Sequence, residues 1–433
     1  SDGAGNYTFS TDVVLRAKAK SSECVLDGRY VGNILAHADG PSAGVHVDMQ
    51  GHKLTLHSLA DGDDRRRAVG IGLVGNSLEI KRAGGVEINI TGTKRSESAI
   101  YVMGNGSKAA TLTIANDDKP ENAVKIRNTA TGEKEAAITA RGSGSKKALV
   151  DIKGLADIEQ AGADLLYATY GGEIRIGGGR FVAKGNEAKA VKITRASKVY
   201  LNAAEEGDGV KATSTERDVV LEGNVMLDGD GGVFGAALNR DTSYIRGIIG
   251  MSSGNGQARL LLSNGARWEN TSVGKRDGNY ASHLSHLKAD NGAIFQEDSK
   301  TLTIDKYSGT GKLFYRHTGD GTRPEDYAGG DTHIKKADAG SSITVVTDRE
   351  NVDTANEDKV YKVLNSLAGK LYYDEAKEGK TNLTGKAMIA EGLTASSASV
   401  EMKEILFKKD SGQGSVAALT PPAPPTQPLD VAD

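Results

Sequence analysis

The pentapeptide GMSSG at positions 250–254 matches the G-x-S-x-G pattern around the nucleophile of many serine hydrolases. In those enzymes the serine lies on a sharp turn that follows a strand and precedes a helix. Here the pentapeptide is followed by Asn255 and Gly256 and then by a strand-like run at 259–262, so no helix is expected. We therefore expect a turn between strands at this position, and we assign no catalytic residue to it.

A second cluster of reactive side chains lies in VHVDMQGHKLTLH at positions 45–57. A zinc site needs three or four ligands in tetrahedral geometry. His46 and Asp48 would share one face of a strand, because side chains alternate along it. Nothing in the spacing directs His52 or His57 to the same point. We expect a solvated polar face, and we predict neither a metal site nor a cofactor.

Three consecutive arginines, Arg65, Arg66 and Arg67, follow an acidic stretch at positions 61–64. We predict that they lie on a loop that protrudes between two strands. Such a run of positive charge could bind a sulfated or sialylated glycan. The alternative is a solvated loop whose charge is balanced by its own aspartates. These arginines are the ligand-binding residues that the sequence pattern suggests.

The composition favours many short strands over a single thick core. The 433 residues include 55 glycines, only 8 prolines and 5% aromatic residues. The net charge of -3 does not suit binding to a nucleic-acid backbone, which requires a strongly basic face. The single cysteine, Cys24, excludes an internal disulfide; this fits a bacterial exported protein and a cytosolic protein equally well.

A short apolar pattern recurs along the first half of the sequence. Its copies are spaced by 24, 25, 17, 25 and 19 residues, with a mean of 22, when the markers are Ile100, Val124, Leu149, Leu166, Val191 and Val210. Each unit holds two or three short alternating runs separated by Gly, Asn and Asp, which predicts strands joined by tight turns. A period superimposed on the strands favours a β-solenoid of about 15 coils over a β-sandwich.

Two segments depart from this pattern. Apolar residues at helical spacing, early acids and Gly369 predict one short helix over 354–370. The stretch TPPAPPTQP at 420–428 holds five of the eight prolines. This composition predicts an extended linker at 411–433 that leads to a further part of the protein, preceded by a C-terminal cap at 351–410.

The segment from Gly265 onward resembles the C-terminal part of pertactin-like autotransporter passengers. The matching stretches follow the order of the family's last coils and are GARW at 265–268, which holds the single tryptophan, LSHLKADNGAIF at 284–295, LTI at 302–304, GTGKLF at 309–314 and DTHIKKADAGSSITVV at 331–346. The glycine-rich period extends a compatible pattern back to the start. Beyond about Asn351 the sequence departs from the family's pattern.

This resemblance implies an all-β fold, a right-handed parallel β-helix, with a passenger at 1–264 and an autochaperone region at 265–350. It also implies type V secretion to the cell surface and a partner in the protein's own C-terminal outer-membrane β-barrel. We expect Trp268, Phe295 and Phe314 to support the autochaperone, because a solenoid needs a stable nucleus for folding. The serine-protease signature of protease passengers is absent.

These features favour an adhesin without enzymatic activity. The expected partners are a host cell-surface or matrix protein, a glycan, or a second copy of the chain in bacterial aggregation and biofilm formation; nucleic acid is not expected. Long rods can bind through many weak contacts in parallel. Two alternatives stay open. One is a polysaccharide-degrading β-helix enzyme, which needs a groove with two carboxylates. The other is a structural stalk without a ligand.

Overall fold

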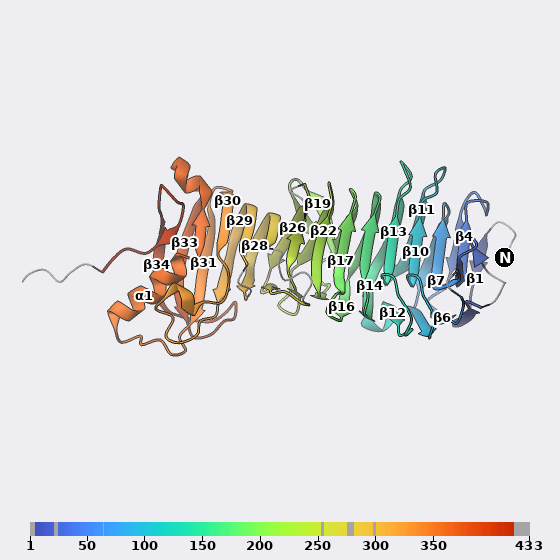
Figure 1. Cartoon of the computed structure of the whole chain (residues 1–433), viewed down its shortest axis with the longest axis horizontal. Helices are drawn as coiled ribbons and strands as arrows, with labels where there is room; N and C mark the ends of the chain where they lie inside the picture. The colour runs from blue at the N-terminus through green and yellow to red at the C-terminus, as the bar shows by residue number, and fades with distance from the viewer. Residues whose placement is uncertain are drawn as a thin grey trace, which may run out of the picture.

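The protein is built almost entirely of β-strands that stack along one axis (Figure 1). The computed structural model describes residues 5–20, 25–63, 65–252, 255–274, 281–297 and 300–419. Within them, 33 strands belong to one sheet system in which most neighbours run parallel, and two further strands form a separate hairpin. The predicted all-β class with many parallel strands is confirmed, and the arrangement is consistent with a β-solenoid.

Three parallel ladders run along the molecule, and a typical coil contributes one strand to each. The first ladder consists of β4 (Tyr30–His37), β7 (Arg67–Val74), β10 (Ile100–Met103), β13 (Ile138–Arg141), β15 (Leu166–Thr169), β17 (Lys189–Thr194), β22 (Asn224–Asp228) and β25 (Ile249–Met251). The short strand β3 (Val25–Leu26) pairs antiparallel with β4.

The second ladder includes the first halves of two long strands, β14 (Ala148–Ala161) and β16 (Gly172–Lys184). Its other members are β1 (Asn6–Thr8), β5 (Val45–Asp48), β8 (Ser77–Ala83), β11 (Ala110–Asn116), β18 (Lys198–Leu201), β23 (Val233–Leu238) and β26 (Gln257–Ser263). The antiparallel hairpin of β19 (Ala203–Glu206) and β20 (Gly209–Ala212) follows β18 and lies outside the ladder.

The third ladder includes the second halves of β14 and β16. Its other members are β2 (Val13–Lys18), β6 (Leu54–Ala60), β9 (Val86–Gly92), β12 (Val124–Asn128), β21 (Val219–Glu222), β24 (Tyr244–Arg246) and β27 (Arg267–Asn270). The long strand β28 (Ser282–Gln296) then pairs with members of all three ladders.

The last coils continue from β28 without a change of direction (Figure 1). They comprise β29 (Leu302–Tyr315), β30 (Thr332–Ala337), β31 (Ser341–Asp348), β32 (Leu371–Tyr373) and β33 (Leu383–Ala390). The antiparallel strands β34 (Ser399–Phe407) and β35 (Gly414–Ser415) follow. Counted through β33, the third ladder holds 13 described strand segments, close to the predicted 15 coils.

The true repeat is longer and less regular than the predicted 22 residues. Positions that are equivalent in the first ladder are separated by 29, 38, 28, 25, 34 and 24 residues, and they are Ile71, Ile100, Ile138, Leu166, Val191, Val225 and Ile249. Three markers of the prediction occupy other places: Val124 lies on the third ladder, Leu149 on the second and Val210 on the hairpin. The prediction mixed the three faces of one coil because their apolar patterns are alike.

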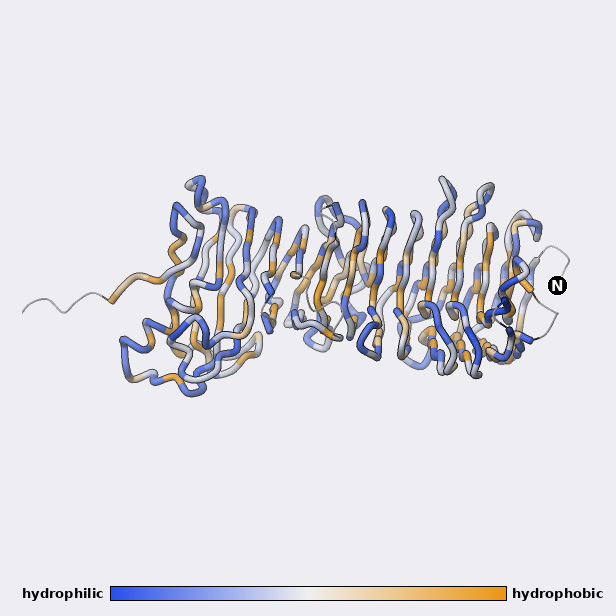
Figure 2. Tube along the Cα trace, in the orientation of Figure 1, coloured by the Kyte–Doolittle hydropathy of each residue, from blue (hydrophilic) through white to orange (hydrophobic). Residues whose placement is uncertain are grey.

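A stack of aliphatic side chains fills the interior, one from each coil. On the second ladder, positions in register along the stack are Val47, Ile80, Ile114, Ile152, Ile176 and Leu201, and each is at most 6% exposed. Burial of each such side chain contributes about 1.5–3 kcal/mol. Figure 2 shows the apolar segments that recur along the stacked strands, with polar residues at many of the turns. Each coil is therefore held by its neighbours.

The predicted helix at 354–370 is confirmed as α1 (Glu357–Ala368), which contacts the last coils. Its N-terminus is capped by the Asn356 side chain, which accepts a hydrogen bond from the Lys359 backbone N–H at 3.2 Å. Val363 and Leu364 lie on its fully buried face. Three short 3-10 helices complete the helical content of the described residues: η1 (Pro120–Asn122), η2 (Pro324–Asp326) and η3 (Asp374–Glu378).

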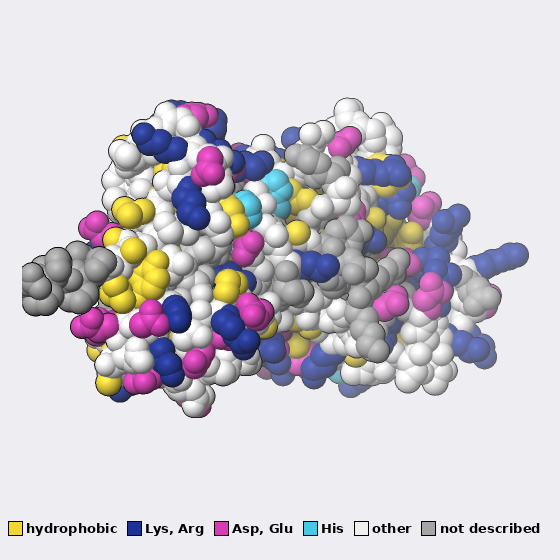
Figure 3. Space-filling model, turned by 60° about the vertical axis from the view of Figure 1, so that its left-hand side comes forward, with side chains coloured by type: hydrophobic (Ala, Val, Ile, Leu, Met, Phe, Trp, Pro, Cys, Tyr) yellow, Lys and Arg dark blue, Asp and Glu magenta, His cyan; other side chains and the backbone are white. Residues whose placement is uncertain are grey.

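The fold continues past residue 411, where the sequence predicted the linker to begin. Val416 is only 5% exposed, and its backbone N–H donates to the Asn365 side chain at 3.2 Å. The proline-rich stretch at 420–428 lies outside the described residues, so its extended character stays a prediction. Figure 3 shows hydrophobic side chains gathered at the C-terminal end, where Met402 and Leu406 are 46% and 54% exposed.

The outer face of the third ladder carries a chain of ion pairs. Glu159 accepts hydrogen bonds from Arg180 at 2.9 Å and Lys184 at 2.5 Å, and Arg180 also contacts Asp157 at 3.2 Å. Asp157 in turn contacts Arg127 of the preceding coil at 2.9 Å. The hydrogen bonds from Lys184 and Arg180 lower the pKa of Glu159 from its usual 4.5 to about 2. The charges on this face are therefore largely satisfied within the protein.

This pairing predicts a specific acid sensitivity. A carboxylate whose pKa is lower in the folded state stabilises the fold above its unfolded pKa, and the stabilisation is lost as the pH falls toward the folded value. We expect wild type to lose more stability between pH 4.5 and pH 2 than Glu159→Gln does. The measurement is the urea midpoint by far-UV circular dichroism across this range. Replacement of the exposed Glu121 by Gln is the control, and an equal change in both variants would contradict the role of Glu159.

Candidate ligand-binding groove

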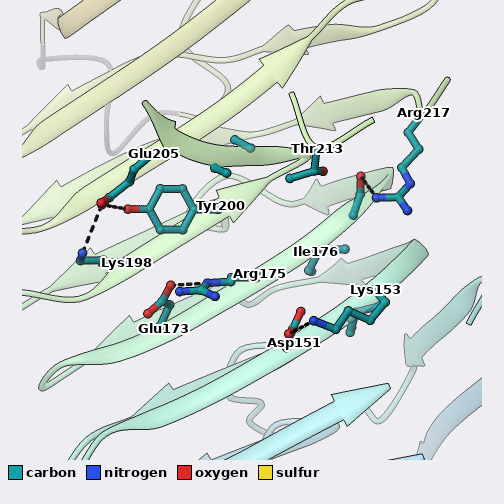
Figure 4. Close-up of a pocket in the computed structure, with 14 residues that line it drawn as sticks. Asp151, Lys153, Glu173, Arg175, Ile176, Lys198, Tyr200, Glu205, Thr213 and Arg217 are labelled. Atoms are coloured by element: carbon teal, nitrogen blue, oxygen red, sulfur yellow. Dashed lines mark hydrogen bonds and ion pairs between the residues drawn. The ribbon is translucent and has the colours of Figure 1, made fainter. Parts of the chain in front are cut away.

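A groove of about 580 Å³ lies on the outer face of the second ladder, where β14, β16 and β18 form its floor (Figure 4). Alternation along these strands directs every second side chain outward, so each coil places charged residues in the groove. Asp151, Arg175 and Tyr200 occupy equivalent positions in three successive coils. Glu173 and Lys198 form a second such row two residues earlier along β16 and β18. Neighbouring residues of one row are separated by the strand spacing of about 4.8 Å.

The β19–β20 hairpin forms one wall of this groove. It leaves the ladder directly after β18, at Asn202, whose backbone φ is +50°. The Asn202 side chain donates to the Ser214 carbonyl at 2.9 Å and accepts from the Ser214 backbone N–H at 3.0 Å, which closes the base of the hairpin. Tyr200, Ala203 and Val210 pack in one apolar cluster beneath it. The base of the hairpin is therefore anchored to the outer face.

Each acidic side chain of the groove has a basic partner. Asp151 contacts Lys153 at 2.6 Å, and Glu173 contacts Arg175 at 2.5 Å. Glu205 of the hairpin accepts a hydrogen bond from the Tyr200 hydroxyl (Figure 4). It accepts a second one from Lys198 at 3.2 Å.

These contacts set the protonation state of the hairpin wall. The hydrogen bond from Tyr200, followed by that from Lys198, lowers the pKa of Glu205. Burial, followed by the contact with Glu205, raises the pKa of Tyr200. Glu205 is thus an ionised acceptor and Tyr200 a neutral donor at neutral pH. The lining offers many hydrogen-bonding groups with nearly balanced charge, which suits a polar, hydroxyl-rich ligand.

Of the three arginines proposed from the sequence, Arg65 is exposed, while the side chains of Arg66 and Arg67 contact other groups of the protein. Arg67 is the first residue of β7, and it pairs with the buried carboxylate of Glu97 at 2.8 Å and with Glu135 at 3.7 Å. The guanidinium of Arg66 donates to the Lys20 carbonyl at 3.2 Å. The prediction of a single protruding loop was wrong for Arg67, because this residue begins β7 and its side chain is paired with Glu97 and Glu135.

The aromatic residues proposed for the autochaperone lie on two sides of the third ladder. Trp268 is fully buried, and its indole N–H donates to the Gly247 carbonyl at 2.8 Å. Phe295 and Phe314 point to the opposite side, where their ring centroids lie 4.6 Å apart in a separate apolar cluster with Met388. The structure therefore pairs the two phenylalanines with each other and separates them from the tryptophan.

The polar residues His46, Asp48 and His52 each contact a different charged side chain and do not converge on one point. His46 contacts Glu79 at 3.1 Å, and Asp48 accepts a hydrogen bond from Arg82 at 2.9 Å. His52 lies 3.5 Å from Asp12. In the part of the chain that the structure describes, no three His, Cys, Asp or Glu side chains gather closely enough to hold a metal ion.

The G-x-S-x-G segment has the surroundings of a turn. The Ser252 hydroxyl lies 3.3 Å from the backbone N–H of Gly229, which donates to it. The next described element is the strand β26, so no helix follows the motif as a nucleophile elbow requires. Ser253 and Gly254 lie outside the described residues, as does Cys24.

Sequence reasoning did not find the groove. Its floor residues look like ordinary solvent-facing positions of an amphipathic strand, and their meeting depends on the register between coils. One local signal was present: the acidic stretch AAEEGDGVKA at 203–212 interrupts the repeat. Val210 within it follows the same apolar pattern as the coils, so the sequence wrongly predicts a coil at this position.

The chain matches no family model, no curated protein and no solved structure. The helices in the part of the chain that the structure describes are too short or too polar to cross a bilayer.

Proposed function

We propose that this chain is the passenger of a bacterial autotransporter, a right-handed parallel β-helix that acts as an adhesin at the cell surface. The observation that carries the proposal is the groove on the second ladder, whose floor is repeated coil by coil and whose wall is a dedicated hairpin. The resemblance of 265–346 to pertactin-like passengers supports the secretion route and the partner β-barrel. The partner on the host side is a cell-surface or matrix protein or a glycan; a second copy of the chain is the alternative partner.

An elongated fold suits adhesion for a physical reason. Each coil exposes a similar row of polar side chains, so a long ligand can contact several coils at once, and weak contacts add up to high avidity. The groove is open to solvent and rich in charged side chains, and its acidic groups are already partnered. Such a surface binds through many hydrogen bonds and does not need a deep pocket.

The test is attachment of beads coated with the purified chain to host epithelial cells, to matrix proteins and to each other. The proposal predicts attachment in at least one arm well above beads coated with a globular protein of similar charge. Attachment only between beads would assign the protein to bacterial aggregation. Attachment in none of the three arms would overturn the adhesin proposal and favour a structural stalk.

A second candidate, a polysaccharide-degrading enzyme, is favoured by the carboxylates Asp151, Glu173 and Glu205 in one groove. Glycosidases need one carboxylic acid that is protonated near neutral pH. The pKa of Glu205 is lowered instead, and Asp151 and Glu173 each form a close ion pair. We therefore expect no release of reducing ends from acidic or neutral polysaccharides, and such release would favour this enzyme.

A further inference from the structure

Four basic residues form a straight row on the outer face beyond the groove. Arg259, His286, Lys306 and Lys336, here called the basic row, occupy equivalent positions in four successive coils. Neighbouring strands are about 4.8 Å apart, so Lys306 and Lys336 bring two positive charges close together, and two like charges at 4 Å repel by about 1 kcal/mol in water and more near a protein surface. Such a row of positive charges lowers the stability of the fold unless negatively charged groups lie close to it.

The tip of the β19–β20 hairpin supplies such a cover. Asp208 contacts Lys306 at 3.1 Å, and Glu205 lies 3.9 Å from Arg259. The backbone of Gly209 rests on the imidazole of His286, and a Cβ at this glycine would lie 2.5 Å from Nδ1. The tip sequence Glu205–Gly209 (EEGDG) thus places acidic groups against two of the four basic residues, Arg259 and Lys306, and its backbone against His286.

The cover is incomplete. Nε of Arg259 and Nδ1 of His286 are buried and have no hydrogen-bond partner among the described residues. Buried polar groups are nearly always hydrogen-bonded, so two unpaired nitrogens in neighbouring coils call for an explanation. Lys336, the next member of the row, is exposed beyond the hairpin. The tip therefore satisfies the basic row only in part.

Burial and two nearby positive charges favour the neutral form of His286. Burial, followed by the positive charge of Lys306, lowers its pKa, and Arg259 acts in the same direction. The acidic side chains of Asp208 and Asp338 oppose this shift. In the closed arrangement His286 therefore adds no charge to the row. Removal of the hairpin tip would expose the imidazole to solvent and to any anion bound beside it.

We propose that the basic row is a binding strip for an acidic polysaccharide, and that the hairpin tip occupies the place of the ligand's acidic groups until the ligand displaces it. This proposal rests on the proposed adhesin function and names the ligand class of the same face. A polymer with regularly repeated sulfate or carboxylate groups matches a straight row better than a single anion does, because several contacts form together. The adjacent groove, with its balanced charge, would contact the sugar hydroxyls.

A nucleic acid fits the strip less well. Proteins that bind single strands combine basic grooves with aromatic side chains on which the bases stack. Tyr200 of the adjacent groove and Tyr307 beside Lys306 are only 4% and 0% exposed, so neither offers a ring for stacking, and the chain as a whole carries a net charge of -3. The polysaccharide is therefore the occupant that these observations favour, and single-stranded DNA serves as a comparison ligand.

The experiment measures binding of the purified full chain to immobilised heparin, a sulfated polysaccharide, at low and physiological salt. Lys306→Ala removes a basic residue, and Asp208→Asn removes the nearer of its two acidic partners, the other being Asp338 at 3.7 Å. Lys288→Ala and Asp290→Asn are the matched controls, because both residues are exposed on β28 and change the net charge equally. Far-UV circular dichroism confirms that each variant is folded.

We expect Lys306→Ala to lower heparin affinity about threefold to fivefold and Asp208→Asn to raise it by a similar factor, with little change in the controls. Heparin is also expected to speed amide hydrogen exchange at 203–212, because the tip is displaced. An unchanged affinity in Asp208→Asn would overturn the proposal, as would equal effects in the controls. If Asp208→Asn raised the affinity for single-stranded DNA as much as the affinity for heparin, the choice of an acidic polysaccharide as the ligand would be overturned.

Bead attachment to cells, measured with the same variants, separates this proposal from the proposed function. If wild-type beads attach to cells but heparin neither binds nor competes, the acidic polysaccharide is excluded and the adhesin proposal stands. If no variant attaches to cells, to matrix or to other beads, the adhesin proposal itself fails. Inorganic sulfate at the same sulfate concentration is the final comparison, and we expect it to compete far less than heparin.

Discussion

Replacement of Trp268 by alanine is expected to lower the free energy of unfolding by about 3–5 kcal/mol. The side chain is fully buried in β27, in register with Ile245 and Ile294 of the neighbouring coils. Truncation leaves a cavity that stacked strands cannot close, and it also removes the donor to the Gly247 carbonyl. The measurement is denaturant unfolding by far-UV circular dichroism, since the variant loses the single tryptophan as a fluorescent probe.

A matched variant tests whether this site also directs folding, as the autochaperone expectation requires. Phe181→Ala removes an equally buried aromatic side chain from β16, in the N-terminal half of the molecule. Both variants should lower stability, but only Trp268→Ala should also slow refolding, because a residue in the folding nucleus acts on the folding rate. Equal refolding rates would contradict an autochaperone centred on Trp268.

Gly179→Ala is expected to have the second large effect. Gly179 lies on β16 with φ at +122°, and a Cβ there would lie 1.9 Å from the Ala156 carbonyl oxygen of the preceding coil. The backbone conformation alone costs an L-residue about 1–3 kcal/mol, and the clash adds about 1–3 kcal/mol. Gly162→Ala is the control, because Gly162 has φ at +75° but no atom within 4 Å of an added Cβ. If both variants were destabilised to a similar extent, the close approach of the Ala156 carbonyl oxygen would not be the reason for glycine at position 179.

Much of the fold could be predicted because each strand of a stacked coil requires alternating buried and exposed residues, which are visible in the sequence. Alternating runs such as LTLHSLA (Leu54–Ala60) specify a buried and a solvent face. The helix α1 carried its own cap and apolar spacing. The register could not be predicted, because Val124 and Ile100 belong to similar apolar runs on different faces of one coil.

The site was harder to predict than the fold for a physical reason. Arg175 and Tyr200 become neighbours only through strand pairing between coils, and nothing local to either residue indicates the partner. Conversely, the run of arginines at 65–67 is conspicuous in sequence, yet the strand β7 places Arg67 against Glu97. The run of arginines therefore gave a wrong prediction for Arg67. The hairpin at 203–212 was not predicted, because Val210 follows the same apolar pattern as the strands of the coils.

The most direct test of the adhesin proposal compares the outer faces of the second and third ladders in the bead-attachment assay. Arg175→Ala with Lys198→Ala removes two basic residues from the groove, while Arg180→Ala with Lys184→Ala removes two from the outer face of the third ladder. The proposal predicts that attachment to cells falls strongly for the groove variant and stays near wild type for the other. Equal attachment of the two variants, or a loss only for the third-ladder variant, would contradict it.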